Sequence, residues 1–316
     1  MKIAFVYPGQ GVQKVGMAQD FVEKYDWAKD MIKEATEASG FDMEKILFEE
    51  NEDIHVTEYT QPCLVTACSI MTKAIEDMGI KPDITAGLSL GEYCALVTAG
   101  AMTFKDAVRL TRIRGNLMSS FVPAGQGTMA AIIALPKETV QQCIDHIDGA
   151  EVANYNCPGQ IVITGEKDAV HEGMEKLSEM GAKKTVELKV SGPFHSPMLK
   201  GAGEKLRLEL DKAVISDLKI PYIANLNAEV IEDTSETRDL LEKQVYSSVM
   251  WEQTLLKLKD LGVDVLVEIG PGKTIAGFVK KTIPDIPVIN VSTVEEAEAL
   301  KDKLNELESF ETAKEA

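Results

Sequence analysis

Two kinds of segment alternate along the chain, and their hydrophobic patterns differ. Short apolar runs bounded by Gly or Pro predict buried strands, and longer segments with apolar residues at helical spacing predict helices. Strands are predicted over 2–8, 82–89, 127–135, 182–190, 219–227 and 262–269, with two more inside 151–165. Helices are predicted over 12–40, 61–79, 90–100, 103–121, 136–148, 166–181, 197–213 and 273–281. This mixture indicates an α/β protein.

The middle of the chain has its own order of elements. From residue 126 to residue 192 the prediction is β-α-β-β-α-β, which is the order of a ferredoxin-like unit. We therefore expect a discontinuous α/β core over 1–125 and 193–316, interrupted by a small subdomain over 126–192. The last segment, 294–316, is strongly charged and predicts a solvated helix that frays into a disordered tail.

Charge and cysteine usage exclude several classes of protein. The net charge is −18 over 316 residues, whereas a nucleic-acid groove needs a basic face. No apolar stretch reaches the roughly 18 residues of a membrane span, and the first apolar run is too short for a signal peptide. The five Cys form no CxxC pair and read as free thiols in a reducing cytoplasm. The four His lack metal-ligand spacing, so we expect no metal and no cofactor.

The stretch "GLSLGEYCAL" places Ser89 between two glycines in a G-x-S-x-G pattern. Glycines at these positions let a strand turn sharply into a helix and present the Ser hydroxyl, as in α/β-hydrolases. The pattern is short, so one polar residue in an ordinary loop is the alternative. Its place between a predicted strand and a predicted helix favours a nucleophile in an α/β-hydrolase-like core.

A Ser nucleophile needs a base within hydrogen-bond reach, and His195 is the best candidate. It lies in "SGPFHSPM", between two prolines, whereas the other His residues stand in polar segments or at a helix end. The third member of a triad stays open. Either a carboxylate of the inserted segment orients His195, or a backbone carbonyl does; the carboxylate candidates are Asp145, Asp148, Glu151 and Asp168.

Three other motifs can take part in a site. The turn "YPGQGVQ" at 7–13 can offer backbone N–H groups to an anion, or can be a plain strand-to-helix turn. "GPGK" at 270–273 does not match a phosphate-binding P-loop and predicts a strand end and a helix start. Arg109, Arg112 and Arg114 lie on one helix, and helical spacing puts Arg114 on a different edge from its neighbours.

Taken together, the motifs resemble one family. "YPGQGVQ", "YTQPCLVTA", "GLSLGEYCALVTAG", "RLTRIRG", "NYNCPGQIVITG", "GPFHSPM" and "VEIGPGK" follow in the order found in malonyl-CoA:acyl-carrier-protein transacylases, from about residue 3 to residue 280. The resemblance implies a ferredoxin-like subdomain at the insertion. It also implies a Ser-His acyl transfer from malonyl-CoA to an acyl carrier protein, in fatty acid synthesis.

The resemblance assigns roles to matching positions. It implies Ser89 as nucleophile, His195 as base, and the backbone N–H groups of Gln10 and Leu90 as oxyanion hole. It implies Arg114 as the partner of the malonyl carboxylate, with Gln61 and Phe194 also at the substrate. The backbone carbonyl of Met250 is expected to orient His195. Two positions depart from the family: Leu88 stands where many members have His, and Met250 where many have a polar side chain.

The expected partners are malonyl-CoA and, transiently, a holo acyl carrier protein, with no nucleic acid and no membrane. We expect a monomer. A carrier is usually acidic, so Lys183, Lys184 and Lys189 are candidates for a local basic docking patch. Three alternatives stay open: a serine thioesterase or hydrolase, a trans-acting acyltransferase of a polyketide pathway, and a carrier-binding protein without activity.

Overall fold

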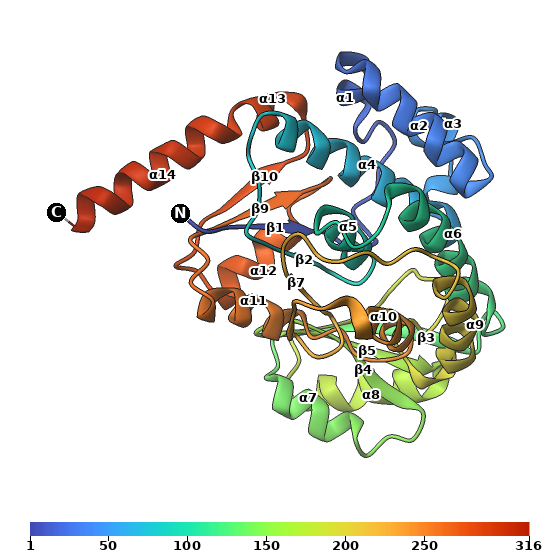
Figure 1. Cartoon of the computed structure of the whole chain (residues 1–316). Helices are drawn as coiled ribbons and strands as arrows, with labels where there is room; N and C mark the ends of the chain where they lie inside the picture. Colours follow the sequence, from blue (N-terminus) through green and yellow to red (C-terminus); the bar gives the residue numbers. More distant parts are fainter. Residues whose placement is uncertain (316) are drawn as a thin grey trace.

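The larger of two β-sheets forms the centre of the molecule (Figure 1). The structure is a computed structural model that describes residues 1–315. Within them, the sheet has the strand order β10-β9-β1-β2-β7-β8. Its strands are β1 (Ile3–Tyr7), β2 (Ile84–Gly87), β7 (Tyr222–Ile223), β8 (Val230–Ile231), β9 (Val265–Ile269) and β10 (Val288–Val291). All neighbours pair in parallel except β7 and β8, so the predicted α/β class is confirmed.

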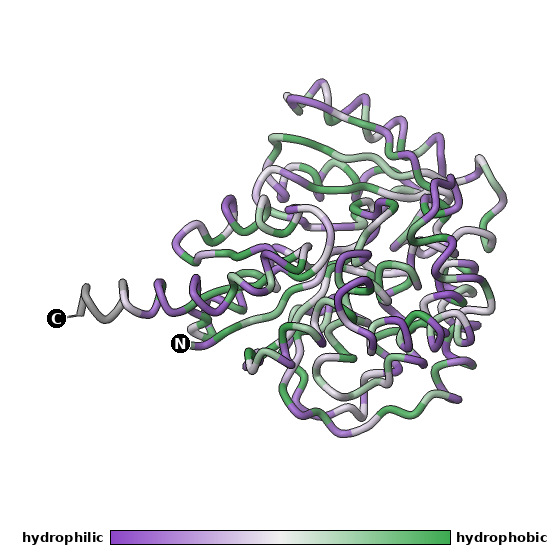
Figure 2. The backbone as a smooth tube through the Cα atoms, turned by 90° about the horizontal axis from the view of Figure 1, so that it is seen from above, coloured by the Kyte–Doolittle hydropathy of each residue, from purple (hydrophilic) through white to green (hydrophobic). Residues whose placement is uncertain are grey.

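Strand β1 is buried on both faces, which explains its continuous apolar sequence. Phe5 and Tyr7 pack in the core beneath α4 (Thr57–Asp77), α5 (Gly91–Thr98) and α6 (Phe104–Ser120). Ala4 and Val6 face the opposite core, formed with α11 (Trp251–Asp260) and α12 (Thr274–Thr282). In Figure 2 the chain turns from hydrophilic to hydrophobic directly after the N-terminus, where β1 begins.

A second, four-stranded antiparallel sheet has the order β4-β5-β3-β6. Its elements are β3 (Gly127–Ile133), α7 (Lys137–Ile144), β4 (Ala150–Cys157), β5 (Gln160–Glu166), α8 (Lys167–Glu179) and β6 (Lys184–Glu187). These elements follow in the predicted order and have a separate apolar core, which includes Ile132, Val140, Ile163 and Leu177. The sheet is thus one compact unit within the predicted range of 126–192.

The second sheet is also hydrogen-bonded, through its edge strand β4, to residues 248–249, which lie just before α11. Tyr155 N donates to Val249 O at 3.0 Å, and Val249 N donates to Ala153 O at 2.8 Å. Ser248 Oγ adds a bond to Val152 O at 2.5 Å. The inserted unit is therefore held at a third place, besides the two points where the chain enters and leaves it.

Seven further helices complete the described part of the chain. They are α1 (Gln19–Lys24), α2 (Asp26–Ser39), α3 (Met43–Phe48), α9 (Lys200–Leu210), α10 (Thr237–Gln244), α13 (Val294–Glu298) and α14 (Leu300–Glu315), with short 3-10 turns at Asp53–His55, Pro197–Leu199 and Thr234–Glu236. Figure 1 shows α14 extending away from the body. The segment expected to fray is helical to Glu315, and residue 316 lies outside the described residues.

Several element boundaries differ from the prediction. Helix α4 begins at Thr57, four residues before the expected start, and contains Pro62 in its second turn. A proline there removes one intrahelical hydrogen bond, because its nitrogen carries no proton. The strand expected over 219–227 is only two residues long, and β8, α10, α11 and β10 lie in segments where no element was predicted.

Candidate active site

Ser89 stands at the end of β2 in a strained turn. Its φ is 50°, in the left-handed region that costs a non-glycine residue about 1–3 kcal/mol. Both glycines of the motif are required by close backbone contacts. A Cβ on Gly87 would lie 1.9 Å from Gly91 O, and one on Gly91 would lie 2.4 Å from Tyr7 O. The turn thus packs closely against the end of β1, and the Ser hydroxyl lies at the carboxyl edge of the parallel sheet.

His195 meets Ser89 from the loop that follows the inserted unit. Its Nε2 lies 2.8 Å from Ser89 Oγ, and the side chain is buried. His195 also has a positive φ, 59°, so both partners occupy a conformation that favours glycine. Strain retained at two facing residues is typical of a functional site.

A backbone carbonyl, and no carboxylate, orients His195. Nδ1 lies 2.8 Å from Gln244 O, and a carbonyl only accepts, so Nδ1 carries the proton and Nε2 is free to accept one. The expectation of Met250 in this role is wrong. The Met250 carbonyl accepts from Thr254 N and Thr254 Oγ1 at the start of α11. Gln244 is the last residue of α10, where helix carbonyls have no intrahelical partner.

Burial lowers the pKa of His195 to about 3, and the positive charge of Arg114 adds to this shift. The imidazole is therefore neutral over the physiological range. A neutral imidazole with a free Nε2 is the form that can take a proton from the Ser89 hydroxyl.

Arg114 points inward from α6 to the same place. It is 1% exposed, and its Nη2 lies 3.2 Å from Ser89 Oγ. Its Nη1 donates to Gln61 Oε1 at 2.8 Å, and Nη2 also donates to Gln244 Oε1 at 2.9 Å. Burial lowers the pKa of Arg114 from its usual value, but a guanidinium stays charged in proteins. The site therefore holds a buried cation beside the Ser hydroxyl.

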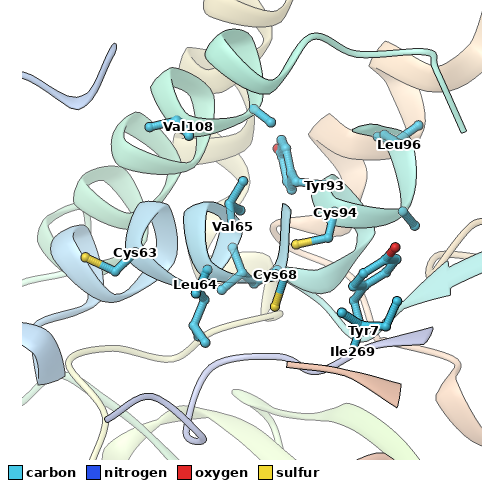
Figure 3. Packing of buried hydrophobic residues seen from close by; sticks show 14 of the residues in the cluster. Tyr7, Cys63, Leu64, Val65, Cys68, Tyr93, Cys94, Leu96, Val108 and Ile269 are labelled. Carbon is cyan, nitrogen blue, oxygen red and sulfur yellow. The ribbon is translucent and has the colours of Figure 1, made fainter. Parts of the chain in front are cut away.

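The other two arginines of α6 lie elsewhere. Arg109 pairs with Glu209 at 3.0 Å, and Arg112 pairs with Glu58 at 2.8 Å and lies over the Tyr59 ring. The aromatic neighbour of Arg114 is Tyr93, whose ring centroid is 5.8 Å away. Figure 3 shows Tyr93 and Cys94 of α5 among the buried side chains next to α4. Cys94 is one of these buried core residues.

The remaining predicted residues are placed as follows. Gln10 and Leu90 lie in the turns after β1 and β2, and within residues 1–315 neither backbone N–H has a protein acceptor. The Gln10 side chain donates to Thr57 Oγ1 at 3.0 Å, which ties its turn to α4. Phe194 is buried in the main core directly before His195.

Three polar residues of the site were not predicted. Asn225 Oδ1 accepts from Ser89 N at 2.5 Å, and its Nδ2 donates to Gly87 O. Gln244 and Glu92 complete this network, with Gln244 Nε2 2.7 Å from Glu92 Oε2. Asn225 had a usable signal, since it follows strand β7 at the edge where Ser89 follows β2. Gln244 lies in a helix that the hydrophobic pattern did not predict.

Some classes of site are not found in the described part of the chain. The described side chains, those of residues 1–309, hold no group of three His, Cys, Asp or Glu placed to bind a metal ion. Over the same residues, no helix combines the length and the apolar character needed to cross a membrane. His55 and His146 are exposed, as expected, and His171 pairs with Glu187 at the rim of the second sheet.

Comparisons with known proteins agree on one family. The family model described as "Acyl transferase domain" matches residues 4–315. A malonyl CoA-acyl carrier protein transacylase of Bacillus subtilis is 42% identical over 310 residues, covering 96% of this chain and 98% of that relative. One from Staphylococcus aureus is 39% identical over 93% of this chain and 97% of its own length.

Solved structures give the same result. The malonyl CoA-acyl carrier protein transacylase from Clostridium perfringens has a TM-score of 0.94 and 39% identity, covering 99% of this chain and 100% of that one. A malonyl-transacylase solved in complex with a type II PKS acyl-carrier protein has a TM-score of 0.91 and 32% identity, covering 95% and 98%. The chain therefore belongs to the acyl transferase family and, within it, to the malonyl CoA-acyl carrier protein transacylases.

Proposed function

We propose that this enzyme transfers the malonyl group of malonyl-CoA to the phosphopantetheine thiol of an acyl carrier protein, supplying fatty acid synthesis. The observation that carries the proposal is the convergence on Ser89 Oγ, where His195 Nε2 lies at 2.8 Å and Arg114 Nη2 at 3.2 Å. A nucleophile, a neutral base and a cation for a carboxylate thus meet at one point. The names of the relatives support the same substrate and acceptor.

In the first half-reaction, His195 Nε2 accepts the proton of Ser89 as its Oγ attacks the thioester carbonyl. The tetrahedral oxyanion is stabilised by the backbone N–H groups of Gln10 and Leu90, each worth about 3 kcal/mol. Their lack of a protein acceptor supports this role. The C–S bond then breaks, the imidazolium returns its proton to the CoA thiolate, and a malonyl ester remains on Ser89.

The second half-reaction runs the same steps with another thiol. His195 takes the proton of the phosphopantetheine thiol, and the sulfur attacks the ester carbonyl. The Ser89 C–O bond breaks, Ser89 Oγ regains a proton from the imidazolium, and the malonyl thioester leaves on the carrier. Neutral His195 suits this double use, because each half-reaction begins with a proton transfer to Nε2.

Arg114 selects the acyl group by pairing with its free carboxylate, in contact with Gln61 and Gln244. Acetyl-CoA lacks this group, so it leaves the guanidinium without that partner and should be a poor substrate. The ring of Phe194 next to His195 would crowd a branched α-carbon, which supports malonyl over methylmalonyl.

The finer fold assignment belongs to the same proposal. An α/β-hydrolase-like core over 1–125 and 193–316 is supported by the strained Ser turn after a parallel strand. A ferredoxin-like subdomain over 126–192 is supported by the β-α-β-β-α-β order and the strand order β4-β5-β3-β6. A monomer and a cytoplasmic location belong to the same proposal, and five free thiols support a reducing cytoplasm.

A carrier-docking patch on the second sheet belongs to the same proposal. Lys183, Lys184 and Lys189 are exposed beside or on the edge strand β6, although Glu187 lies on the same strand. Charge reversal at Lys183 and Lys184 should raise KM for the carrier and leave KM for malonyl-CoA unchanged. Unchanged values for both would exclude this docking patch.

The test of the function is intact-protein mass after brief mixing with malonyl-CoA, for wild type and Ser89→Ala. We expect a malonyl adduct on the wild type alone, discharged by holo carrier protein. Loss of the adduct to water at the same rate without carrier would instead indicate a thioesterase. An adduct with a different acyl-CoA only, or discharge only to a polyketide carrier, would indicate a polyketide acyltransferase.

A further inference from the structure

Arg114 has an unusual set of partners. Its guanidinium is buried, and among the described side chains, those of residues 1–309, no carboxylate lies within ion-pair distance of it. It is held by neutral oxygens instead: the amide oxygens of Gln61 and Gln244 and the hydroxyl of Ser89. Its buried Nε has no hydrogen-bond partner in the described part of the chain. A direct carboxylate partner would compete with a substrate carboxylate, and neutral oxygens do not.

A side-chain amide can face Arg114 with either its oxygen or its NH2 group. The amide of Gln244 can turn over, which exchanges its oxygen and its NH2 group. With the oxygen toward Arg114, as in this structure, the contact is attractive. With the NH2 group there, two donors face each other beside a buried cation, and a hydrogen bond to a charged group is lost.

Glu92 is placed to choose between the two orientations. It lies in the first turn of α5, is 1% exposed, and its Oε2 accepts from Gln244 Nε2 at 2.7 Å. The same oxygen accepts from Asn225 N at 3.2 Å, which fixes the carboxyl group in place. Ser89 O is a second acceptor of Gln244 Nε2, at 2.9 Å. With two acceptors on this side, the NH2 group is held there and the oxygen is turned toward Arg114.

We infer that Glu92 is a positioning residue for substrate selection, which acts through Gln244 to keep an oxygen on Arg114 and so holds the guanidinium ready for a carboxylate. The inference rests on the proposed function and deepens it, since it concerns how the same site prefers acyl groups that carry a free carboxylate. Glu92 touches neither Arg114 nor Ser89 Oγ through any hydrogen bond of its own. Its effect should therefore appear in selectivity, separately from the chemistry common to all acyl groups.

The experiment compares kcat/KM for malonyl-CoA and acetyl-CoA, with holo carrier protein as acceptor, in wild type, Glu92→Gln and Glu92→Leu. Glu92→Gln keeps an oxygen that can accept from Gln244, so its malonyl-to-acetyl ratio should stay within about threefold of wild type. Glu92→Leu removes the acceptor, and its ratio should fall by about tenfold to a hundredfold, the range for a lost bond to a charged group. The fall should be in malonyl transfer.

A matched control is Glu268, another fully buried carboxylate, which accepts from Ile275 N, Ala276 N and Asn290 Nδ2 away from the site. Glu268→Leu should lower the melting temperature without changing the ratio. If Glu92→Leu does not fold, Gln244→Met supplies the same measurement, because it removes the amide and retains the main-chain carbonyl on His195. Its ratio should also fall.

Two results would overturn the inference. One is an equal loss of malonyl and acetyl transfer in Glu92→Leu or Gln244→Met, which a merely structural role would produce. The other is a fall in the ratio for Glu92→Gln as large as for Glu92→Leu, which would make the charge of Glu92 decisive. A wild type that transfers no malonyl group would refute the proposed function instead, so the two failures are distinguishable.

Discussion

Replacement of Arg114 by Ala is the sharpest test of substrate selection. Arg114 is 1% exposed and is charged without a carboxylate partner, so a bound malonyl carboxylate would form a fully desolvated pair with it. Removal of one partner from a buried pair costs about 3–5 kcal/mol. At about 1.4 kcal/mol per factor of ten, this equals a loss of roughly 150- to 5,000-fold in kcat/KM for malonyl-CoA.

Acetyl transfer should fall much less. An acetyl group makes no pair with Arg114, so in acetyl transfer the variant loses one contact to a reacting atom, that of Nη2 with Ser89 Oγ at 3.2 Å. We expect this to cost less than about tenfold, the range of one hydrogen bond. The assay is transfer from each acyl-CoA to holo carrier protein, with single-turnover mass measurements to separate acylation of Ser89 from discharge.

The control is Arg109→Ala on the same helix. Arg109 is partly exposed and pairs with Glu209, so its loss should change both activities by less than about threefold. Equal losses of malonyl and acetyl transfer in Arg114→Ala would refute the reasoning, because the guanidinium would then serve the chemistry common to both substrates.

The remaining predictions concern acid-base behaviour and packing. Burial and Arg114 lower the pKa of His195 to about 3, so kcat/KM should not decrease as the pH falls through 6.5. A decrease with a midpoint near pH 6.5 would show that His195 is not a neutral base of low pKa. Burial raises the pKa of Glu92 to about 7 from 4.5, so the wild type should lose stability relative to Glu92→Gln as the pH rises from 4.5 to 7. Denaturant titration should give a difference in unfolding free energy of about 3 kcal/mol above pH 7. A pH-independent difference would exclude an ionising Glu92. Gly91→Ala should destabilise the fold by about 1–3 kcal/mol or more and slow malonylation, since its Cβ would lie 2.4 Å from Tyr7 O; unchanged melting and acylation would show that the turn can relax.

Much of the fold and the centre of the site could be predicted from local patterns. Strand β1 is a continuous apolar run before Pro and Gly, the Ser89 turn has two glycines, and helix α6 combines helical spacing with the cap Thr103. Their positions therefore follow from short-range physics. His195 stood out because two prolines flank a segment without helical or strand pattern. The structure brings Ser89, His195 and Arg114 together although 106 positions separate the first two.

The residues that support the site depend on tertiary contacts and were missed or misplaced. Gln244 lies in a polar segment whose helix has few apolar positions, and its contact with His195 comes from a main-chain carbonyl, which any residue could supply. Met250 was expected in its place because it stands at the matching position of the resembled family. Glu92 looks like an ordinary helix carboxylate in the sequence, and only the packing of α5 against the sheet buries it.

The hydrogen bonds between edge strand β4 and residues 248–249 have a consequence for protein engineering. Ser248 and Val249 lie four and five positions after Gln244, whose carbonyl holds the imidazole. A chimera that exchanges only 126–192 with a relative would pair a foreign strand β4 with the original residues 248–249. The exchanged unit should therefore include the 245–250 segment, so that the transplanted sheet brings its own attachment and His195 keeps its alignment.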